Sequence, residues 1–175
     1  MGKFNNKVEA EFNPPRNWIL SRMLTYTNSD IDEDALERVG VSIKGSKISA
    51  RKGFVTDLAS VPRICWIILA PWDVARAAII HDLLYKRIRQ YRAECSRREK
   101  NFGVIGLKKN DEDPKVICAA KKAADKIFRM AMKDAEPSVS GWKIFGAYYA
   151  VRMFGRWSII PGDDDYDEIS DEISD

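Results

Sequence analysis

The sequence predicts an α+β protein in which a small N-terminal antiparallel β layer packs against about three C-terminal helices. Residues 1–63 consist of short strand-like and turn-like stretches, whereas apolar side chains recur at helical spacing over residues 72–157. The length of 175 residues suffices for one ordinary core and is too short for two. We therefore expect one domain over residues 1–162, followed by an acidic, flexible tail over residues 163–175.

The N-terminal region is expected to form strands joined by turns. Trp18–Thr27 has the composition of a single strand. Val41–Ile43 and Ile48–Ala50 alternate apolar and polar residues around Lys44–Lys47, whose glycine suits a hairpin turn. Between Thr27 and Val41, Asp30–Glu37 predicts an acidic turn or a short helix.

Three helices are predicted in the second half of the chain. The first covers about residues 73–92, because its apolar residues recur at three- and four-residue steps. The second begins at Pro114, which suits a first helical turn, and ends near residue 137. The third covers residues 140–155. Residues 95–113 are polar and contain glycine, so they are expected to form an exposed connection.

Composition restricts the class of protein. The formal charge of +3 hides an asymmetry, because residues 163–175 hold eight acids and no Lys or Arg. Residues 1–162 therefore carry 29 Lys and Arg against 18 Asp and Glu, a net charge of +11. Three cysteines without paired spacing predict neither a disulfide framework nor a zinc site, and favour a reducing compartment.

Neither a membrane span nor an export signal is predicted. The longest uncharged apolar run, Ile64–Trp72, has nine residues. A membrane span needs roughly 20 such residues. The N-terminal residues also lack the hydrophobic core of an export signal.

The residues suited to specific chemistry gather in two short stretches. Residues 53–63 place Asp57 and Ser60 among apolar neighbours, and the only histidine follows in the pair His81-Asp82. A single histidine excludes every signature that needs two. No Gly-x-x-x-x-Gly-Lys loop or Gly-x-Gly-x-x-Gly fingerprint occurs, so the sequence gives no support for nucleotide-cofactor binding by those routes.

A helical projection places His81 at the centre of the apolar stripe of the first helix, so its side chain should be buried. Asp82 lies about 100° further around the helix and does not face His81. A partner for the imidazole must come from another segment, and Asp57 is the candidate. A carboxylate bonded to one ring nitrogen leaves the other nitrogen as a base or a metal ligand.

Three interpretations of these residues remain open. In the first, Asp57 pins a turn, His81 is a core histidine, and Asp82 pairs with Lys86 or Arg89 of its own helix. In the second, Asp57, His81 and Asp82 hold one divalent metal ion that activates water. In the third, which the sequence supports least, Ser60 is a nucleophile served by the imidazole.

Four blocks of this sequence, which span about 100 residues, resemble the phage and prophage family called domain of unknown function 1353. The blocks are Gly53-Phe54-x-Thr56-Asp57-Leu58-Ala59-Ser60-Val61-Pro62, Ala77-Ala78-Ile79-Ile80-His81-Asp82-Leu83-Leu84-Tyr85, Ala124-Asp125-x-x-Phe128 and Tyr149-x-x-Val151-Arg152-x-Phe154-Gly155. The resemblance implies a phage origin and a location in the virion or the host cytoplasm. It implies no activity.

The family pattern implies a single polar cluster and a further candidate metal ligand. Its members would be Asp57, His81, Asp82 and Asp125. The helical projection places Asp125 away from the apolar stripe of the second helix, between Lys121 and Arg129, where a surface salt bridge is expected. Either the second helix is covered on two faces or Asp125 is solvated.

A basic stretch covers the end of the first helix and the residues beyond it. Its cations are Lys86, Arg87, Arg89, Arg92, Arg97, Arg98 and Lys100, against Glu94 and Glu99. This density suits nucleic acid or another acidic surface as partner. An ordinary solvated helix face is the alternative, and the acidic tail is a further candidate to screen the patch.

Two functions from different classes follow. The first is a non-catalytic phage protein, virion-associated or involved in assembly, whose partners are other phage structural proteins and whose Asp57/His81/Asp82 cluster is structural. The second is a metal-dependent hydrolase in which the same three residues activate water at a divalent ion.

Overall fold

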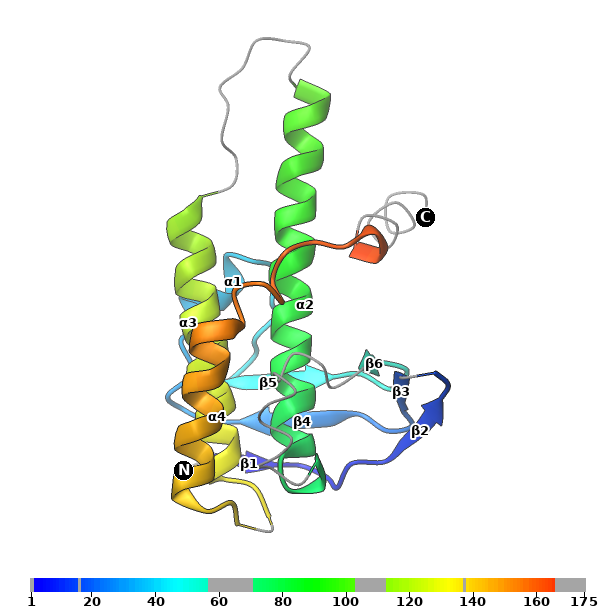
Figure 1. Ribbon diagram of the computed structural model, residues 1–175, viewed down its shortest axis with the longest axis vertical. Coiled ribbons are helices and arrows are strands. Elements are labelled where there is room, and N and C mark those ends of the chain that lie inside the picture. Colours follow the sequence, from blue (N-terminus) through cyan, green and yellow to red (C-terminus); the bar gives the residue numbers. More distant parts are fainter. Residues whose placement is uncertain (1, 16, 57–70, 103–112, 137, 166–175) are drawn as a thin grey trace.

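The computed structural model describes residues 2–15, 17–56, 71–102, 113–136 and 138–165, and it has the predicted α+β class (Figure 1). Strands and one short helix come first, and three long helices follow. In chain order the elements are β1 (Lys3–Phe4), β2 (Ala10–Asn13), β3 (Asn17–Leu20), β4 (Leu24–Thr27), α1 (Glu33–Glu37), β5 (Lys47–Ala50), β6 (Val55–Thr56), α2 (Pro71–Phe102), α3 (Pro114–Lys133) and α4 (Gly141–Phe154).

The strands form two antiparallel sheets of three strands, in the orders β1-β4-β5 and β2-β3-β6. The prediction of one strand over residues 18–27 is wrong, because β3 and β4 belong to different sheets. In an unbroken strand, Arg22 would share a face with Leu20 and Leu24, which are both buried. The break instead leaves Arg22 exposed, where it pairs with Glu9 at 3.3 Å.

The predicted hairpin over residues 41–50 is also wrong. Ile48 of β5 pairs with Tyr26 of β4, and residues 41–46 form no strand. Gly45 and Ser46 both have positive φ angles, 61° and 55°, so the chain turns there without a partner strand before it. Of the two alternatives for residues 30–37, the structure has the short helix α1, whose first turn is capped by Asp32.

The three long helices follow the predictions, with one difference in length. Helix α2 continues to residue 102, whereas the sequence predicted an end near residue 92 and an exposed connection from residue 95. Arg and Glu favour helix intrinsically, and Glu94 and Arg98 face each other one turn apart at 3.8 Å. Asp113 caps α3, and α4 ends at Gly155 as predicted.

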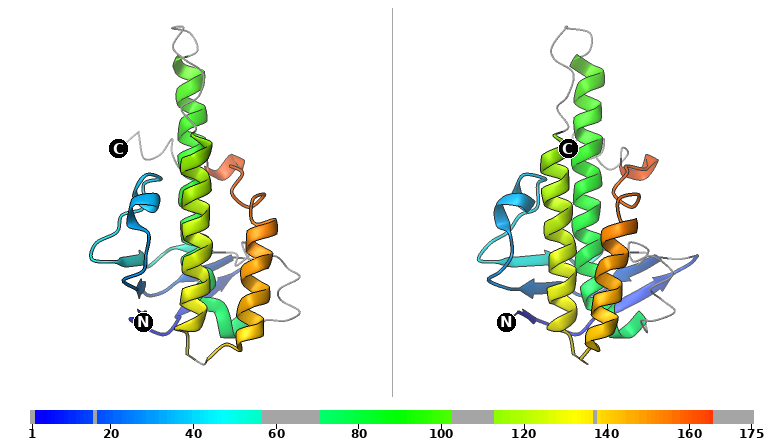
Figure 2. Two further views of the ribbon diagram at one scale, coloured as in Figure 1. Left: turned by 90° about the vertical axis from the view of Figure 1, so that its left-hand side faces the viewer. Right: turned by 60° about the vertical axis from the view of Figure 1, so that its left-hand side comes forward.

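The core lies where α2 packs on α3 and on strands β5 and β6, while α1 and α4 pack on α3. Figure 2 shows α3 between α1 on one side and α4 on the other. Ile80, Leu84 and Ile88 of α2 are fully buried there, together with Ile127 and Phe128 of α3. None of the described helices has the length and apolar character that crossing a membrane requires.

A polar contact fixes the sheet to the end of α3. The carboxylate of Asp134 accepts hydrogen bonds from the Tyr26 hydroxyl at 2.7 Å and the Gly2 amide at 3.0 Å. Burial, and then the bond to Asp134, raise the pKa of Tyr26 well above its ordinary value. Tyr26 therefore remains a donor and holds β4 against α3.

Candidate functional site

The inward faces of α2, α3 and α4 meet at Asp125. His81 and Tyr85 lie one turn apart on α2, and their ring centroids are 4.0 Å apart. Phe128 of α3 also packs on the His81 ring, with centroids 4.8 Å apart. Because α4 covers a second face of α3, a residue away from the main apolar stripe of α3 is also buried.

Asp125 accepts four hydrogen bonds, two on each carboxylate oxygen. Oδ1 accepts from the Tyr85 hydroxyl at 2.6 Å and faces His81 Nε2 at 3.2 Å. Oδ2 accepts from Lys121 Nζ at 2.8 Å and from Arg152 Nη1 at 3.1 Å. We call these five residues the Asp125 network.

The network is closed to solvent at its centre. The side chains of His81 and Asp125 are both 0% exposed. Lys121 also donates to the carbonyl of Val151 at 3.0 Å, so the same ammonium joins α3 to α4. A buried carboxylate without partners would be very costly, and here every lone-pair direction faces a donor from the protein itself.

The surroundings of Asp125 keep it ionised. Burial alone would raise its pKa, but the hydrogen bond from His81 and the attraction to it, with the bonds from Lys121 and Tyr85, lower that pKa to about 2. Burial and the charge of Asp125 raise the pKa of Tyr85 far above its ordinary value. At neutral pH, Tyr85 is therefore a hydrogen-bond donor and Asp125 an acceptor.

These protonation states fix the orientation of the imidazole. An ionised carboxylate only accepts, so His81 Nε2 must carry the hydrogen in the contact with Asp125. In the neutral ring, Nδ1 then holds the lone pair. Nδ1 is buried, and no residue in the described part of the chain bonds to it. This is the arrangement by which a carboxylate prepares a histidine as a base or ligand.

The structure brings together some of the candidate residues and separates others. Asp57 and Ser60 lie outside the described residues. His81 is buried, as its place on the apolar stripe predicts. Asp82 is also buried, but its Oδ2 accepts from the Thr56 hydroxyl of β6, so the Asp82 side chain joins α2 to the sheet. Of the two alternatives for Asp125, the structure has the first, in which α3 is covered on two faces. The salt bridge between Asp125 and Lys121, which was expected at the surface, is buried.

Sequence reasoning missed three members of the network. Tyr85 was not singled out as a hydrogen-bond donor, although it stands one helical turn after His81. Lys121 was placed beside Asp125, but on the surface. Arg152 shows no local signal, because its contact joins residues 27 positions apart on different helices. Only its presence in a shared sequence block marked it.

The metal site of Asp57, His81 and Asp82 stays a prediction from the sequence. In the parts of the chain described above, no three His, Cys, Asp or Glu side chains gather closely enough to hold a metal ion. The proposed set includes Asp57, which lies outside those parts. Asp125, the ligand implied by the resemblance, has both oxygens occupied by donors from the protein.

The described cations of the basic stretch of α2 make different kinds of contact. Arg89 Nε donates to both oxygens of Asp165, at 3.2 and 3.1 Å, and its Nη1 donates to the Ser158 carbonyl. Arg92 donates to the Ile159 carbonyl at 2.8 Å. These two cations hold residues 158–165 against the helix. Lys86 and Arg87 face a different side, where they line a cavity.

Helix α4 and the turn after it expose a group of large apolar side chains, which we call the α4 face. Its members are Trp142, Phe145, Tyr149, Met153, Phe154, Trp157 and Ile160. Trp142 and Met153 are each 64% exposed. The Phe145 and Tyr149 rings lie 4.4 Å apart, so part of the face is a continuous aromatic surface.

Comparison with known proteins identifies a family and gives no further relative. A family model with the description "Protein of unknown function (DUF1353)" matches residues 36–151, a range that holds the whole Asp125 network except Arg152. Neither the curated proteins nor the solved structures contain a significant match.

Proposed function

The chain belongs to the DUF1353 family, whose description assigns no activity, and we propose that it is a non-catalytic bacteriophage protein that is virion-associated or acts in assembly. The observation that carries this proposal is the closure of the Asp125 network. Both oxygens of Asp125 are occupied by donors of the fold, and the His81 ring is fully buried. The Asp125 network therefore holds three helices together.

The α4 face supports a role in association. Monomeric proteins rarely expose a contiguous apolar patch of this kind unless it binds something. Aromatic residues and Met are enriched at protein interfaces. Lys143 and Arg156 lie among these residues, and the sequence holds no Asp or Glu from residue 138 to 162. The partner that fits is another protein of the particle, with an apolar surface bordered by acidic side chains.

Mass spectrometry of purified phage particles and assembly intermediates tests this proposal. The wild-type chain is expected in one of these fractions. The double variant Trp142→Ser/Phe145→Ser should fold normally, because both side chains are exposed, and should be lost from that fraction. Phe12→Ser/Met23→Ser, which removes exposed apolar side chains from the sheet region, is the matched control and should be retained.

The proposal is contradicted if the wild-type chain is missing from particles and intermediates, or if the double variant is retained at the wild-type level. It is also contradicted if the α4 face binds anionic lipid vesicles in place of a protein.

A metal-dependent hydrolase is the second candidate, favoured by one observation. His81 Nδ1 is directed by the Asp125 contact and has no bonding partner among the described residues, as a metal ligand would require. Asp82 follows His81 directly, and Asp57 lies one residue beyond Thr56, which bonds Asp82.

Metal content separates the two candidates. Stoichiometric divalent metal in protein purified without chelator, and its loss in folded His81→Gln protein, would support the hydrolase. Folded wild-type protein that takes up no Zn²⁺, Mn²⁺ or Mg²⁺ on titration would end it.

A further inference from the structure

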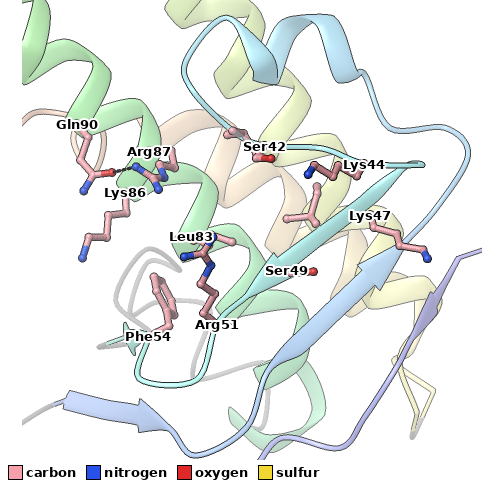
Figure 3. Close-up of a pocket in the computed structure, with 12 residues that line it drawn as sticks. Ser42, Lys44, Lys47, Ser49, Arg51, Phe54, Leu83, Lys86, Arg87 and Gln90 are labelled. Atoms are coloured by element: carbon pink, nitrogen blue, oxygen red, sulfur yellow. Dashed lines mark hydrogen bonds between the residues drawn. The ribbon is translucent and has the colours of Figure 1, made fainter. Parts of the chain in front are cut away.

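A cavity of about 550 Å³ lies between α2 and β5, on the side of α2 that faces away from the Asp125 network (Figure 3). One wall is formed by Leu83, Lys86, Arg87 and Gln90 of α2. The opposite wall is formed by Val41, Ser42 and Lys44 and by residues of β5 with Arg51 and Phe54 after it. This volume lies within the range of roughly 300–1,000 Å³ that is usual for small-ligand sites.

The charged side chains that the structure describes in the walls of this cavity are all positive. Five of the described lining residues are cations, namely Lys44, Lys47, Arg51, Lys86 and Arg87, and none of the described lining residues is Asp or Glu. Like charges gathered around a concave surface repel one another and focus a positive potential into it. An anionic ligand would relieve this repulsion. The Arg87 guanidinium is oriented by its bond to Gln90 Oε1 at 3.0 Å (Figure 3).

The rest of the wall is suited to a flat, uncharged group. Phe54 is half-buried at the edge of the cavity, with Lys86 Nζ 5.9 Å from its ring centroid. Val41, Ile48 and Leu83 add apolar surface, and Ser42 and Ser49 add hydroxyl groups. An inorganic anion would leave this ring and apolar surface unused. A ligand that joins a planar ring to phosphate groups would use both parts.

We propose that this cavity binds nucleotide phosphates, with the base against Phe54 and the phosphates among Lys44, Arg51 and Arg87. Arg forms paired hydrogen bonds to phosphate oxygens, and aromatic rings stack on any base. Phosphate recognition here uses side-chain cations, since the chain has no glycine-rich phosphate loop. The nucleotide is either free in solution or part of a single strand of nucleic acid.

Isothermal titration of the full chain tests the site with four probes: ATP, adenosine, sodium tripolyphosphate and a ten-residue single-stranded oligothymidylate. We expect saturable binding of ATP or of the oligonucleotide and weaker binding of tripolyphosphate. Added salt should weaken the binding of these three anionic probes. ATP as the tighter ligand identifies a free nucleotide as the source, and the oligonucleotide as the tighter ligand identifies nucleic acid.

Two variants locate the binding. Arg51→Ser/Arg87→Ser should weaken nucleotide binding by about tenfold for each lost cation, because bonds to charged groups contribute that much. Phe54→Leu should weaken ATP binding and leave tripolyphosphate binding unchanged. The matched control is Arg38→Ser/Lys115→Ser, which removes the same charge from exposed positions outside the cavity. Circular dichroism and the unfolding midpoint establish that each variant is folded.

The proposal is overturned if neither ATP nor the oligonucleotide binds the wild-type chain. It is also overturned if the control variant weakens binding as much as the cavity variant, or if tripolyphosphate binds as tightly as ATP.

Discussion

Asp125 shows how a single residue can join three helices. Its partners Lys121 and Arg152 supply two positive charges. Tyr85 supplies a hydroxyl donor, and His81 supplies a ring N–H donor. Removing one member of a buried ion pair costs about 3–5 kcal/mol, because the remaining charge is left without compensation. The network is therefore a strong constraint on the fold even if its net contribution to stability is modest.

The first prediction concerns acid stability. The pKa of Asp125 is lowered from 3.8 to about 2 in the folded protein, so ionised Asp125 stabilises the fold above pH 4. This contribution, roughly 2 kcal/mol, is lost as the pH falls from about 4 to about 2. Asp125→Asn should therefore be clearly less stable than wild type at pH 6, and the difference should narrow by that amount at pH 2.

Urea unfolding at a series of pH values measures this difference. Asp164→Asn, at an exposed position, is the control and should differ little from wild type at any pH. A difference between wild type and Asp125→Asn that does not change with pH would contradict the assigned pKa.

For individual residues, the sequence predicted part of the candidate site. The burial of His81 follows from its position on one apolar stripe, which is a local property. The position of Asp125 depends on which faces of α3 are covered. That depends on α4, which lies far along the chain, so periodicity could only leave both alternatives open.

At the scale of elements, the contact between α2 and the end of α4 requires a residue without a side chain. A Cβ atom placed on Gly155 would collide with the Tyr85 hydroxyl and the Val151 carbonyl. Tyr85 is held in place by its bond to Asp125, so it cannot move aside without losing that bond. Gly155 is therefore needed for close packing, and its φ angle of −65° makes no special demand.

The second prediction compares two glycines of this region. Gly155→Ala should lower the free energy of unfolding by about 1–3 kcal/mol through overpacking. Gly146→Ala, within α4 and with no atom within 4 Å of the added Cβ, should raise it by about 0.5–1 kcal/mol through helix propensity. Thermal unfolding of the two variants and wild type measures both effects. Equal effects of the two changes would show that Tyr85 does not lie against Gly155.

The strands of this protein are harder to predict from the sequence than its helices. A helix is recognised from its own periodicity, so α3 and α4 were located closely. The break between β3 and β4 is set by the need to keep Arg22 in solvent while Leu20 and Leu24 are buried. That need appears only once both sheets are in place.

Over the whole molecule, positive and negative charge are divided along the chain. Residues 1–162 have a net charge of +11, and residues 163–175 contribute eight acids. Asp165 is buried and pairs with Arg89, so at least this acid neutralises a cation of the basic stretch.

The third prediction follows from this division. Removal of residues 163–175 should strengthen salt-sensitive retention of the protein on immobilised single-stranded DNA, since it removes eight negative charges and releases Arg89. Asp165→Asn should give a smaller increase of the same sign. Unchanged retention of the truncated protein would show that these residues do not screen the basic surface.

Nitrogen NMR of protein labelled only at histidine shows whether the His81 imidazole is enclosed and directed by Asp125. His81 is the only histidine, so one pair of ring signals reports on the network. We predict a proton fixed on Nε2 that exchanges slowly with water, and faster exchange in Asp125→Asn. A ring proton that exchanges rapidly in the folded wild-type protein, with both tautomers populated, would show that Asp125 neither encloses nor directs the imidazole.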